Sequence, residues 1–277
     1  MNQPQPKSAA IGKWWDHAAS FVSGCTRVSE DCRRCWSLAN EHRFKVDGSV
    51  CFHPERLDKP LRVRKPCVWA AWNDLFHPDV TDAQIDSAFA VMALSPRQTF
   101  VVLTKRAERM QKYLESRSHS SKFWEEANTT GFATRYEEWS LIPFPLPNLI
   151  VGTTAENQRR ADERIPLLLA TPAVYRMVSV EPMLSRVNLD LHQETPDPDG
   201  CYEDRCYGIH LVVVGCETGA GRRPCALAWI IDVVEQCRAA GVPVWVKAVD
   251  LGKRISHDPA EWPPELTRLG NLREFVR

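Results

Sequence analysis

The stretch "CVWAAWNDLFHPDVTDAQIDSAFAVMALSPRQTFVVLT" (67–104) contains one complete strand–helix–strand unit. Its first six residues and its last six (99–104) are short apolar runs, which predict strands buried on both faces. Between these runs, residues 81–94 carry apolar side chains at helical spacing and predict a helix. Thr81 or Asp82 is suited to cap its first turn. A helix that links two buried strands is typical of a parallel sheet.

The rest of the chain repeats this alternation of strand and helix. The further predicted strands lie at 20–25, 148–154, 174–180, 209–215 and 242–249, and the further predicted helices at 105–117 and 227–241. About seven strands in an α/β chain favour a partial or complete (βα) barrel of parallel strands, with a doubly wound open sheet as the alternative. We expect a single domain over residues 1–277, with a Pro- and Asp-rich loop insertion at 192–208.

Composition excludes several classes of protein. Lys and Arg number 35, Asp and Glu also number 35, and hydrophobic residues make up 44%, which is typical of a globular protein without an overall electrostatic demand for nucleic acid. No apolar run has the length of a membrane span, and the N-terminus "MNQPQPKSAA" lacks the apolar core of a signal peptide, so we expect a cytoplasmic protein without a membrane partner. Disulfides seldom persist in that compartment, so the ten cysteines are expected to be free thiols, metal ligands or catalytic groups.

Three of these cysteines lie close together in "SGCTRVSEDCRRCW" (23–36), with six residues between Cys25 and Cys32 and two between Cys32 and Cys35. Thiolates are soft ligands that suit zinc or an iron–sulfur cluster. A structural zinc site closes four ligands. If the segment that follows is one helix, His42 lies about 10 Å along its axis from Cys35 and is too far to be the fourth.

Cys51 and Cys67 remain candidates for a fourth zinc ligand. A three-thiolate [4Fe–4S] cluster needs no fourth protein ligand and leaves one iron open to a small molecule, so the spacing favours a cluster over zinc or incidental thiols.

Polar or ionisable side chains follow nearly every predicted strand. In a βα barrel the loops after the strands build the site, because the carboxyl ends of parallel strands meet at one face. Each of these side chains has an alternative role as a helix cap or a surface ion pair. The residues in question are Asn73, Asp74, Lys105, Arg106, Thr153, Thr154, Glu156, Glu181, Glu217, Lys247 and Asp250.

Six ordered segments between residues 13 and 247 resemble a phage- and mobile-element-borne family of three-cysteine proteins of the radical S-adenosylmethionine (radical-SAM) type. They are "SGCTRVSEDCRRCW", "WNDLFHPDVTDAQIDSAFAVMA", "TFVVLTKRAERM", "NLIVGTTAENQRRADERIPLLLATPA", "MVSVEPML" and "LVVVGCETGAGRRP". The chain departs from the family pattern at Cys216, where the family usually has glycine, and at "KAVDLG", which replaces Lys-Gln-Trp-Gly.

This resemblance implies a [4Fe–4S] cluster on Cys25, Cys32 and Cys35 and S-adenosylmethionine across the strand ends. It implies an enzyme that reductively cleaves S-adenosylmethionine to a 5′-deoxyadenosyl radical, with a reductant such as flavodoxin or ferredoxin. The residues that it implicates in cofactor binding are Asn73 and Asp74 for the methionine amine, Lys105 or Arg106 for its carboxylate or a substrate phosphate, Thr153, Thr154, Glu156 and Asn157 for the ribose, and Glu181 and Glu217 for adenine, ribose or substrate.

Two functional classes remain open. One is a radical-SAM enzyme that modifies a nucleic-acid base or nucleotide, a substrate suggested by the basic segment "RLDKPLRVRKP" (56–66) and by Arg222 and Arg223. The other is a non-catalytic iron–sulfur or zinc protein that acts through a protein or nucleic-acid partner. A small second metal site at Cys201 and Cys206 is a further hypothesis, while the remaining cysteines are expected to pack as small apolar side chains.

Overall fold

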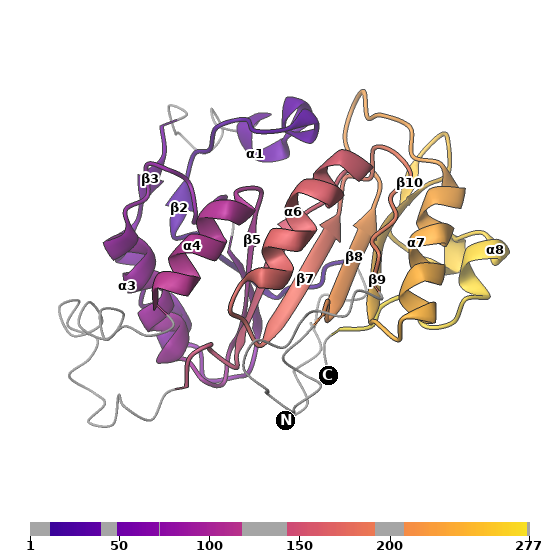
Figure 1. The fold of residues 1–277 in the computed structure, drawn as a ribbon. Helices are drawn as coiled ribbons and strands as arrows, with labels where there is room; N and C mark the ends of the chain where they lie inside the picture. The colour runs from indigo at the N-terminus through magenta and orange to yellow at the C-terminus, as the bar shows by residue number, and fades with distance from the viewer. Residues whose placement is uncertain (1–11, 40–48, 72, 118–142, 192–207, 276–277) are drawn as a thin grey trace. The chain divides into compact units, whose positions relative to one another are not determined.

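A computed structural model describes residues 12–39, 49–71, 73–117, 143–191 and 208–275 of the chain (Figure 1). Within these residues, hydrogen bonds join eight strands in the order β1-β4-β5-β6-β7-β8-β9-β10. The strands are β1 (His17–Ala19), β4 (Val68–Ala71), β5 (Thr99–Thr104), β6 (Leu149–Thr154), β7 (Tyr175–Val180), β8 (Leu211–Gly215), β9 (Val244–Asp250) and β10 (Ile255–Ser256). A separate two-stranded sheet pairs β2 (Val22–Ser23) with β3 (Cys51–Phe52).

The large sheet is mostly parallel, as its apolar strand sequences predict. Strand β4 pairs in parallel with both β1 and β5, and β8 pairs in parallel with both β7 and β9. Among the strand pairings described for the large sheet, only that of β10 with β9 is antiparallel. The predicted α/β class with parallel strands is therefore confirmed. In the described chain the strand order begins at β1 and ends at β10, and closure into a barrel stays a prediction.

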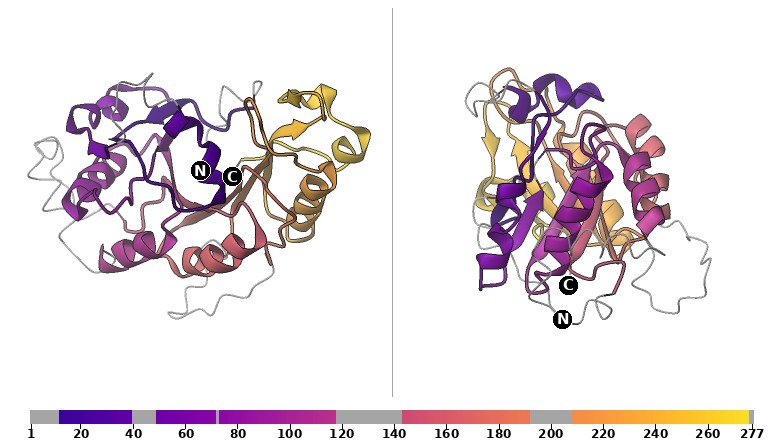
Figure 2. Two further views of the ribbon diagram at one scale, coloured as in Figure 1. Left: turned by 90° about the horizontal axis from the view of Figure 1, so that it is seen from above. Right: turned by 90° about the vertical axis from the view of Figure 1, so that its left-hand side faces the viewer.

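Contacts divide the chain into two compact units, one comprising His17–Val151 with Ala170–Val174, the other Met1–Asp16, Gly152–Leu169 and Tyr175–Arg277. We call them the cysteine unit and the C-terminal unit. In the cysteine unit, helices α3 (Asp82–Ala93) and α4 (Ala107–Arg117) flank β4 and β5 (Figures 1 and 2). Its shorter helical elements are η2 (Glu30–Arg34), α1 (Trp36–Ala39), η3 (Pro54–Arg56) and α2 (Lys59–Arg62).

Helix α3 begins where the sequence predicts. Thr81 is the N-cap and forms a capping box with Gln84, each side chain bonding to the other residue's backbone N–H. An aromatic cluster then joins α3 to α4, with ring centroids of Phe76, Phe89 and Tyr113 separated by 5.5–6.4 Å. This cluster fixes the segment that leaves β4, which carries two of the predicted site residues.

The C-terminal unit contains helices α6 (Gln158–Ala170), α7 (Leu227–Ala239), η6 (Pro259–Glu261) and α8 (Pro264–Thr267). Its strands β7, β8 and β9 are almost wholly buried. The Trp245 indole packs edge-on against Phe275 and donates through Nε1 to the Gly12 carbonyl at 3.2 Å. Because these strands are buried on both faces, most of their residues are apolar.

Two local predictions were wrong. The first strand of the large sheet is β1 (His17–Ala19), whereas the predicted strand at 20–25 contains only β2, which belongs to the small sheet. The cysteine segment is also not one helix, because a 3-10 turn (η2) ends at Arg34 and α1 begins at Trp36. Without that single helix, the axial spacing from Cys35 does not exclude His42 as a fourth ligand, and His42 itself lies outside the described residues.

Candidate functional site

The loop that carries Cys25 is shaped by a glycine that no other residue can replace without movement. Gly24 has a φ of +75°, and an added Cβ would lie 2.1 Å from the carbonyl oxygen of Ser49. This close approach occurs where the β2–β3 pairing, with Ser23 opposite Cys51, brings two chain segments together. Cys25 follows directly, with its thiol half-buried and its Sγ 3.5 Å from the Thr26 carbonyl. The sequence "SGC" thus sets where this thiol lies.

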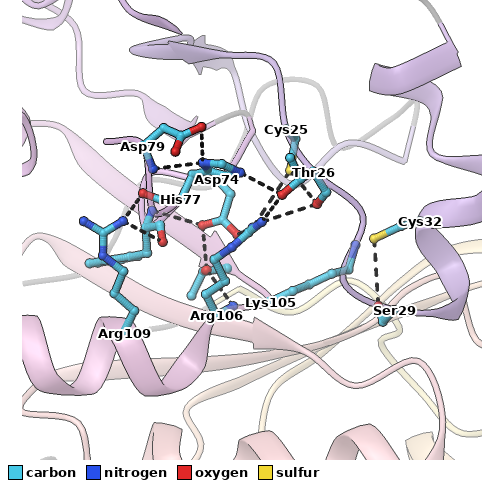
Figure 3. Close-up of polar contacts among 12 residues, drawn as sticks. Cys25, Thr26, Ser29, Cys32, Asp74, His77, Asp79, Lys105, Arg106 and Arg109 are labelled. Atoms are coloured by element: carbon cyan, nitrogen blue, oxygen red, sulfur yellow. Dashed lines mark hydrogen bonds and ion pairs between the residues drawn. The ribbon is translucent and has the colours of Figure 1, made fainter. Parts of the chain in front are cut away.

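Arg106, which follows β5, connects the Cys25 loop to the ends of two strands of the large sheet (Figure 3). Its Nη1 donates to Asp74 Oδ2 at 2.5 Å and lies 4.0 Å from Cys25 Sγ. Its Nη2 donates to the hydroxyl and the carbonyl of Thr26, at 2.8 and 3.3 Å. Asp74 in turn accepts from the Thr104 hydroxyl at 2.6 Å. One guanidinium therefore bridges a buried carboxylate and a cysteine loop.

A buried histidine completes this network. The backbone N–H of Asp79 donates to Nδ1 of His77 at 3.1 Å, so the neutral ring carries its proton on Nε2. That nitrogen lies 2.8 Å from the Thr26 hydroxyl and donates to it. Burial lowers the pKa of His77, and the nearby Arg106 guanidinium lowers it further. The neutral ring is thus the form that this site favours.

Cys32 and Cys35 lie on and directly after the 3-10 turn η2. The backbone N–H of Cys35 donates to the Cys32 carbonyl at 3.4 Å, so the two residues are one turn apart, as their spacing predicts. Ser29 lies 3.9 Å from Cys32 Sγ and donates to Asp31 at 2.6 Å. Lys105 extends from the end of β5 toward this turn (Figure 3). It pairs with Asp31 at 2.7 Å.

Lys105 and Arg106 therefore lie beside the cysteine segments, and each forms an ion pair with an Asp side chain. Burial opposes the charge on Lys105, yet Asp31 and the Cys32 thiol together raise its pKa above the usual value. Burial raises the pKa of the Cys25 thiol, Asp74 raises it further, and Arg106 opposes both. In the absence of a metal this site holds Cys25 as a thiol rather than a thiolate.

Asn73 has a structural function in this arrangement. Its φ of +61° is a left-handed conformation that asparagine tolerates better than most residues. Its amide nitrogen donates to the Val22 carbonyl at 3.0 Å, and its amide oxygen accepts from the Ser37 hydroxyl at 2.7 Å. Both ends of the amide are engaged, which fastens the small sheet and α1 to the end of β4.

The residue types at this site suit an iron–sulfur cluster, but the described side chains are not positioned to bind one. Three thiols with two neighbouring cations suit an anionic cluster. However, no group of three or more His, Cys, Asp or Glu side chains in the described residues is placed so that it could hold a metal ion. Of the two candidate fourth ligands for zinc, Cys67 is buried and Cys51 is exposed.

The predicted ribose-binding residues lie in the C-terminal unit, at the end of β6 and the start of α6. Thr153 and Thr154 are buried, and Asn157 accepts from the backbone N–H of Arg160 at 3.0 Å as a helix cap would. Glu156 is fully buried and accepts from Arg164 Nη1 at 3.0 Å through Oε2. Its other oxygen, Oε1, has no hydrogen-bond partner and lies 4.0 Å from Nε of Arg160.

The remaining predicted acids of the C-terminal unit are all ion-paired. Glu181 pairs with Lys247, whose Nζ also lies 5.4 Å from the ring centroid of Trp15. Glu217 accepts from the backbone N–H and Nε of Arg223 at 2.7 and 3.0 Å. A third pair joins Arg222 to Asp250 at 3.5 Å.

The structure thus places the predicted site residues in two groups. Cys25, Cys32, Cys35, Asn73, Asp74 and Lys105 belong to the cysteine unit, and Thr153, Thr154, Glu156, Asn157, Glu181 and Glu217 to the C-terminal unit. Sequence reasoning missed Thr26, Asp31, His77 and Thr104. Their closeness in sequence to Cys25, Cys32, Asp74 and Lys105 was the only available signal, and it does not reveal the pairing.

Four of the other described cysteines are packed as apolar side chains, whereas Cys51 is exposed. Cys67, Cys216, Cys225 and Cys237 are buried, and burial raises the pKa of each of the last three to about 12. The hypothetical second metal site at Cys201 and Cys206, and the insertion at 192–208 except for Gly208, lie outside the described residues. In the part of the chain that is described, no helix combines the length and apolar character needed to cross a membrane.

Comparison with known sequences assigns the chain to a family but not to an activity. A search of curated proteins finds no match, and neither does a search of solved structures. One family model, described as "Protein of unknown function (DUF5131)", matches residues 9–258, a range that includes both groups of predicted site residues. The chain therefore belongs to the DUF5131 family.

Proposed function

We propose that the protein is an iron–sulfur enzyme of the radical-SAM type, built on a partial or complete (βα) barrel. The observation that carries this proposal is the cysteine unit, where three thiols lie on two segments fastened to the ends of β4 and β5 by Arg106 and Lys105. Parallel α/β folds build their sites at the carboxyl ends of the strands. Three thiols at that edge, with cations beside them, support an iron–sulfur function more than a structural one.

Cys25, Cys32 and Cys35 would hold a [4Fe–4S] cluster. When bound, the cluster would supply the electron for reductive cleavage of S-adenosylmethionine, and a flavodoxin or ferredoxin would supply that electron in turn. The chain's own contribution is electrostatic and positional. Arg106 and Lys105 place positive charge beside the thiols, and the Asp74–Arg106 pair keeps the Cys25 loop against the sheet.

Binding of S-adenosylmethionine is supported most directly at Glu156. Its buried Oε1 lacks a hydrogen-bond partner, which is costly in a folded protein and is relieved by a donor such as a ribose hydroxyl or a water. Thr153, Thr154 and Asn157 flank it in sequence. Glu181 and Glu217 would have to exchange their present cations for ligand contacts, and so would Asp74 and Lys105. Asn73 would have to release the two hydrogen bonds of its amide.

A nucleic-acid base or nucleotide is the substrate class that we favour. The segment 56–66 contains five Lys or Arg residues and one Asp, and its cations are exposed. Such a segment attracts phosphates through charge alone. The resemblance to proteins borne by phages and mobile elements is in keeping with that substrate class.

A non-catalytic iron–sulfur or zinc protein is the second candidate. One observation favours it: most of the acids and amides predicted to contact S-adenosylmethionine are already engaged within the chain. A protein that binds metal and a partner, without S-adenosylmethionine, does not need these groups to be free.

Anaerobic reconstitution with iron and sulfide tests the proposal. We expect about four irons per chain and a brown protein. Substitution of Cys25, Cys32 or Cys35 with Ser should abolish the colour, while Cys237→Ser, a matched change at a buried thiol of α7, should not. With dithionite and S-adenosylmethionine, the reconstituted protein should release 5′-deoxyadenosine. A cluster without that product would favour the non-catalytic candidate, and a colourless protein with bound zinc would exclude both iron–sulfur versions.

A further inference from the structure

The cysteine unit contains a cavity that shares no lining residue with the network around Cys25. It has a volume of ≈ 290 Å³. Its lining comes from β1 and the two residues that follow it, from Trp69 of β4, and from Arg56 and the start of α2. The lining residues are Ala18, Ala19, Ser20, Phe21, Arg56, Lys59, Pro60 and Trp69.

Two cations stand in the wall of this cavity. Lys59 is exposed and has no ion-pair or hydrogen-bond partner among the described residues. Arg56 pairs with Glu55 at 3.4 Å and donates from Nη1 to the Ser20 carbonyl at 3.1 Å, which holds the guanidinium at the cavity. Both belong to the basic segment 56–66, whose excess positive charge makes the electrostatic potential at the cavity more positive.

Another part of the lining comes from β1, the strand at one end of the large sheet. In the described residues β1 pairs with β4 and with no other strand. The far side of a strand that is paired on one side presents backbone N–H and carbonyl groups to whatever lies next to it. Ala18 and Ala19 of β1 line the cavity, and Ala18 is half-buried while Ala19 is buried.

Two aromatic residues, Trp69 and Phe21, are among the residues that line the cavity. The Trp69 ring is fully buried, packs 4.6 Å from the His17 ring and donates through Nε1 to Gln98 at 3.0 Å. Phe21 is also buried and lies in the wall. A ligand in this space would therefore meet two cations and the residues of β1, while Trp69 and Phe21 are buried behind the cavity surface.

We propose that this cavity binds a terminal phosphate monoester of nucleotide size, with the phosphate between Arg56 and Lys59 and the remaining atoms along the β1 edge. Two adjacent cations match the charge of a phosphate dianion. Ligand pockets generally span about 300–1,000 Å³, so this one accepts a single small unit and not a folded partner. Such a monoester is found both in a free mononucleotide and at the 5′ end of a nucleic acid. The site is independent of the cysteines and of any cluster.

Calorimetric titration of the full chain with 5′-AMP, adenosine and a 5′-phosphorylated oligonucleotide tests this site. We expect 5′-AMP to bind and adenosine not to bind at comparable concentration. Lys59→Gln breaks no contact in the described structure, so it should fold normally and weaken 5′-AMP binding about tenfold or more, the equivalent of one charge-assisted hydrogen bond. Adding Arg56→Gln should weaken it further.

The matched control is Arg64→Gln with Lys65→Gln, which removes two charges from the same segment but none from the cavity. That control should change 5′-AMP binding less than threefold. Tighter binding of the phosphorylated oligonucleotide than of 5′-AMP would identify nucleic-acid ends as the source of the phosphate. Absence of 5′-AMP binding to the wild-type chain, equal binding of adenosine, or equal losses in the cavity and control variants would overturn the proposal.

Discussion

Arg106 and Asp74 form an ion pair of 2.5 Å, with about a tenth of each side chain exposed, between the segments that leave β5 and β4. The same guanidinium nitrogen lies 4.0 Å from Cys25 Sγ. The carboxylate is thereby neutralised next to a thiol whose pKa burial and Asp74 both raise. After burial, Asp74 and Arg106 therefore have the largest effects on the pKa of Cys25.

Arg106→Gln should destabilise the protein by about 3 kcal/mol, because it leaves Asp74 buried without a counter-charge. Urea denaturation measures this loss. The double variant Arg106→Gln with Asp74→Asn should recover a large part of it, since no uncompensated charge remains. If the double variant loses as much as the two single variants combined, the pair is not the source of the stability.

Lys105 should contribute stability through Asp31. Their separation is 2.7 Å, and Asp31 has a side-chain exposure of only 3%. Lys105→Met should cost about 2–3 kcal/mol, less than for a fully buried pair because the lysine is partly exposed. The matched control is Lys112→Met, which removes a surface pair with Glu108 of 2.6 Å and should cost far less than Lys105→Met, because water screens this exposed pair. Equal losses in urea denaturation would show that Asp31 does not depend on Lys105.

Gly24→Ala should distort the loop that carries Cys25. The alanine must adopt a φ near +75° and also displace the Ser49 carbonyl, which the new Cβ would otherwise approach to 2.1 Å. We expect a loss well above the ~1–2 kcal/mol of the left-handed backbone alone. Gly270→Ala is the control, because Gly270 has a φ of +93° and nothing within 4 Å of an added Cβ. Thermal unfolding that is equal in the two variants would contradict the close approach at Gly24.

The histidine of the network should make folding stability depend on pH. Its pKa is lowered in the folded protein, by burial and by Arg106, while Asp79 and Asp74 oppose this and Arg109 adds to it. The unfolded state therefore binds more protons as pH falls below the usual value of about 6.5, so stability is intact above that pH and is lost below it. His77→Gln retains a side-chain donor and should flatten this dependence between pH 8 and pH 5.5 in urea denaturation. An unchanged slope would assign the dependence to other groups.

The strands and helices could be predicted from sequence because their apolar runs encode burial directly. β5 has the bounds that the run 99–104 predicts, and α3 has the expected cap. β1 was missed because its three residues, His17–Ala19, carry almost no apolar signal. α6 was not predicted either, and it contains Pro166, a residue that disfavours the interior of a helix.

For the site, the sequence could predict only which polar residues follow the strands, and not which residues they contact. Asp74, Lys105 and Glu217 do follow the strands β4, β5 and β8, and their roles at a site stay a prediction. The partner of each is set by tertiary contacts, and nothing in the sequence around Asp31 or Thr26 indicates that they pair with Lys105 and Arg106. This is why residues predicted to contact a cofactor are found instead in ion pairs within the chain.

The last prediction concerns Arg222 and Arg223, which the sequence suggests as phosphate ligands. The structure pairs Arg223 with Glu217, which is only 6% exposed, and Arg222 with Asp250. Arg223→Gln should therefore cost about 2 kcal/mol of folding stability through the unpaired Glu217, and adding Glu217→Gln should restore most of it. Single-stranded DNA binding by Arg222→Gln with Arg223→Gln, measured at two salt concentrations, should change less than threefold with an unaltered salt slope, because neither cation is available to a phosphate. A shallower slope, by about one unit for each arginine, would instead show that phosphate displaces these carboxylates and that the loop binds nucleic acid.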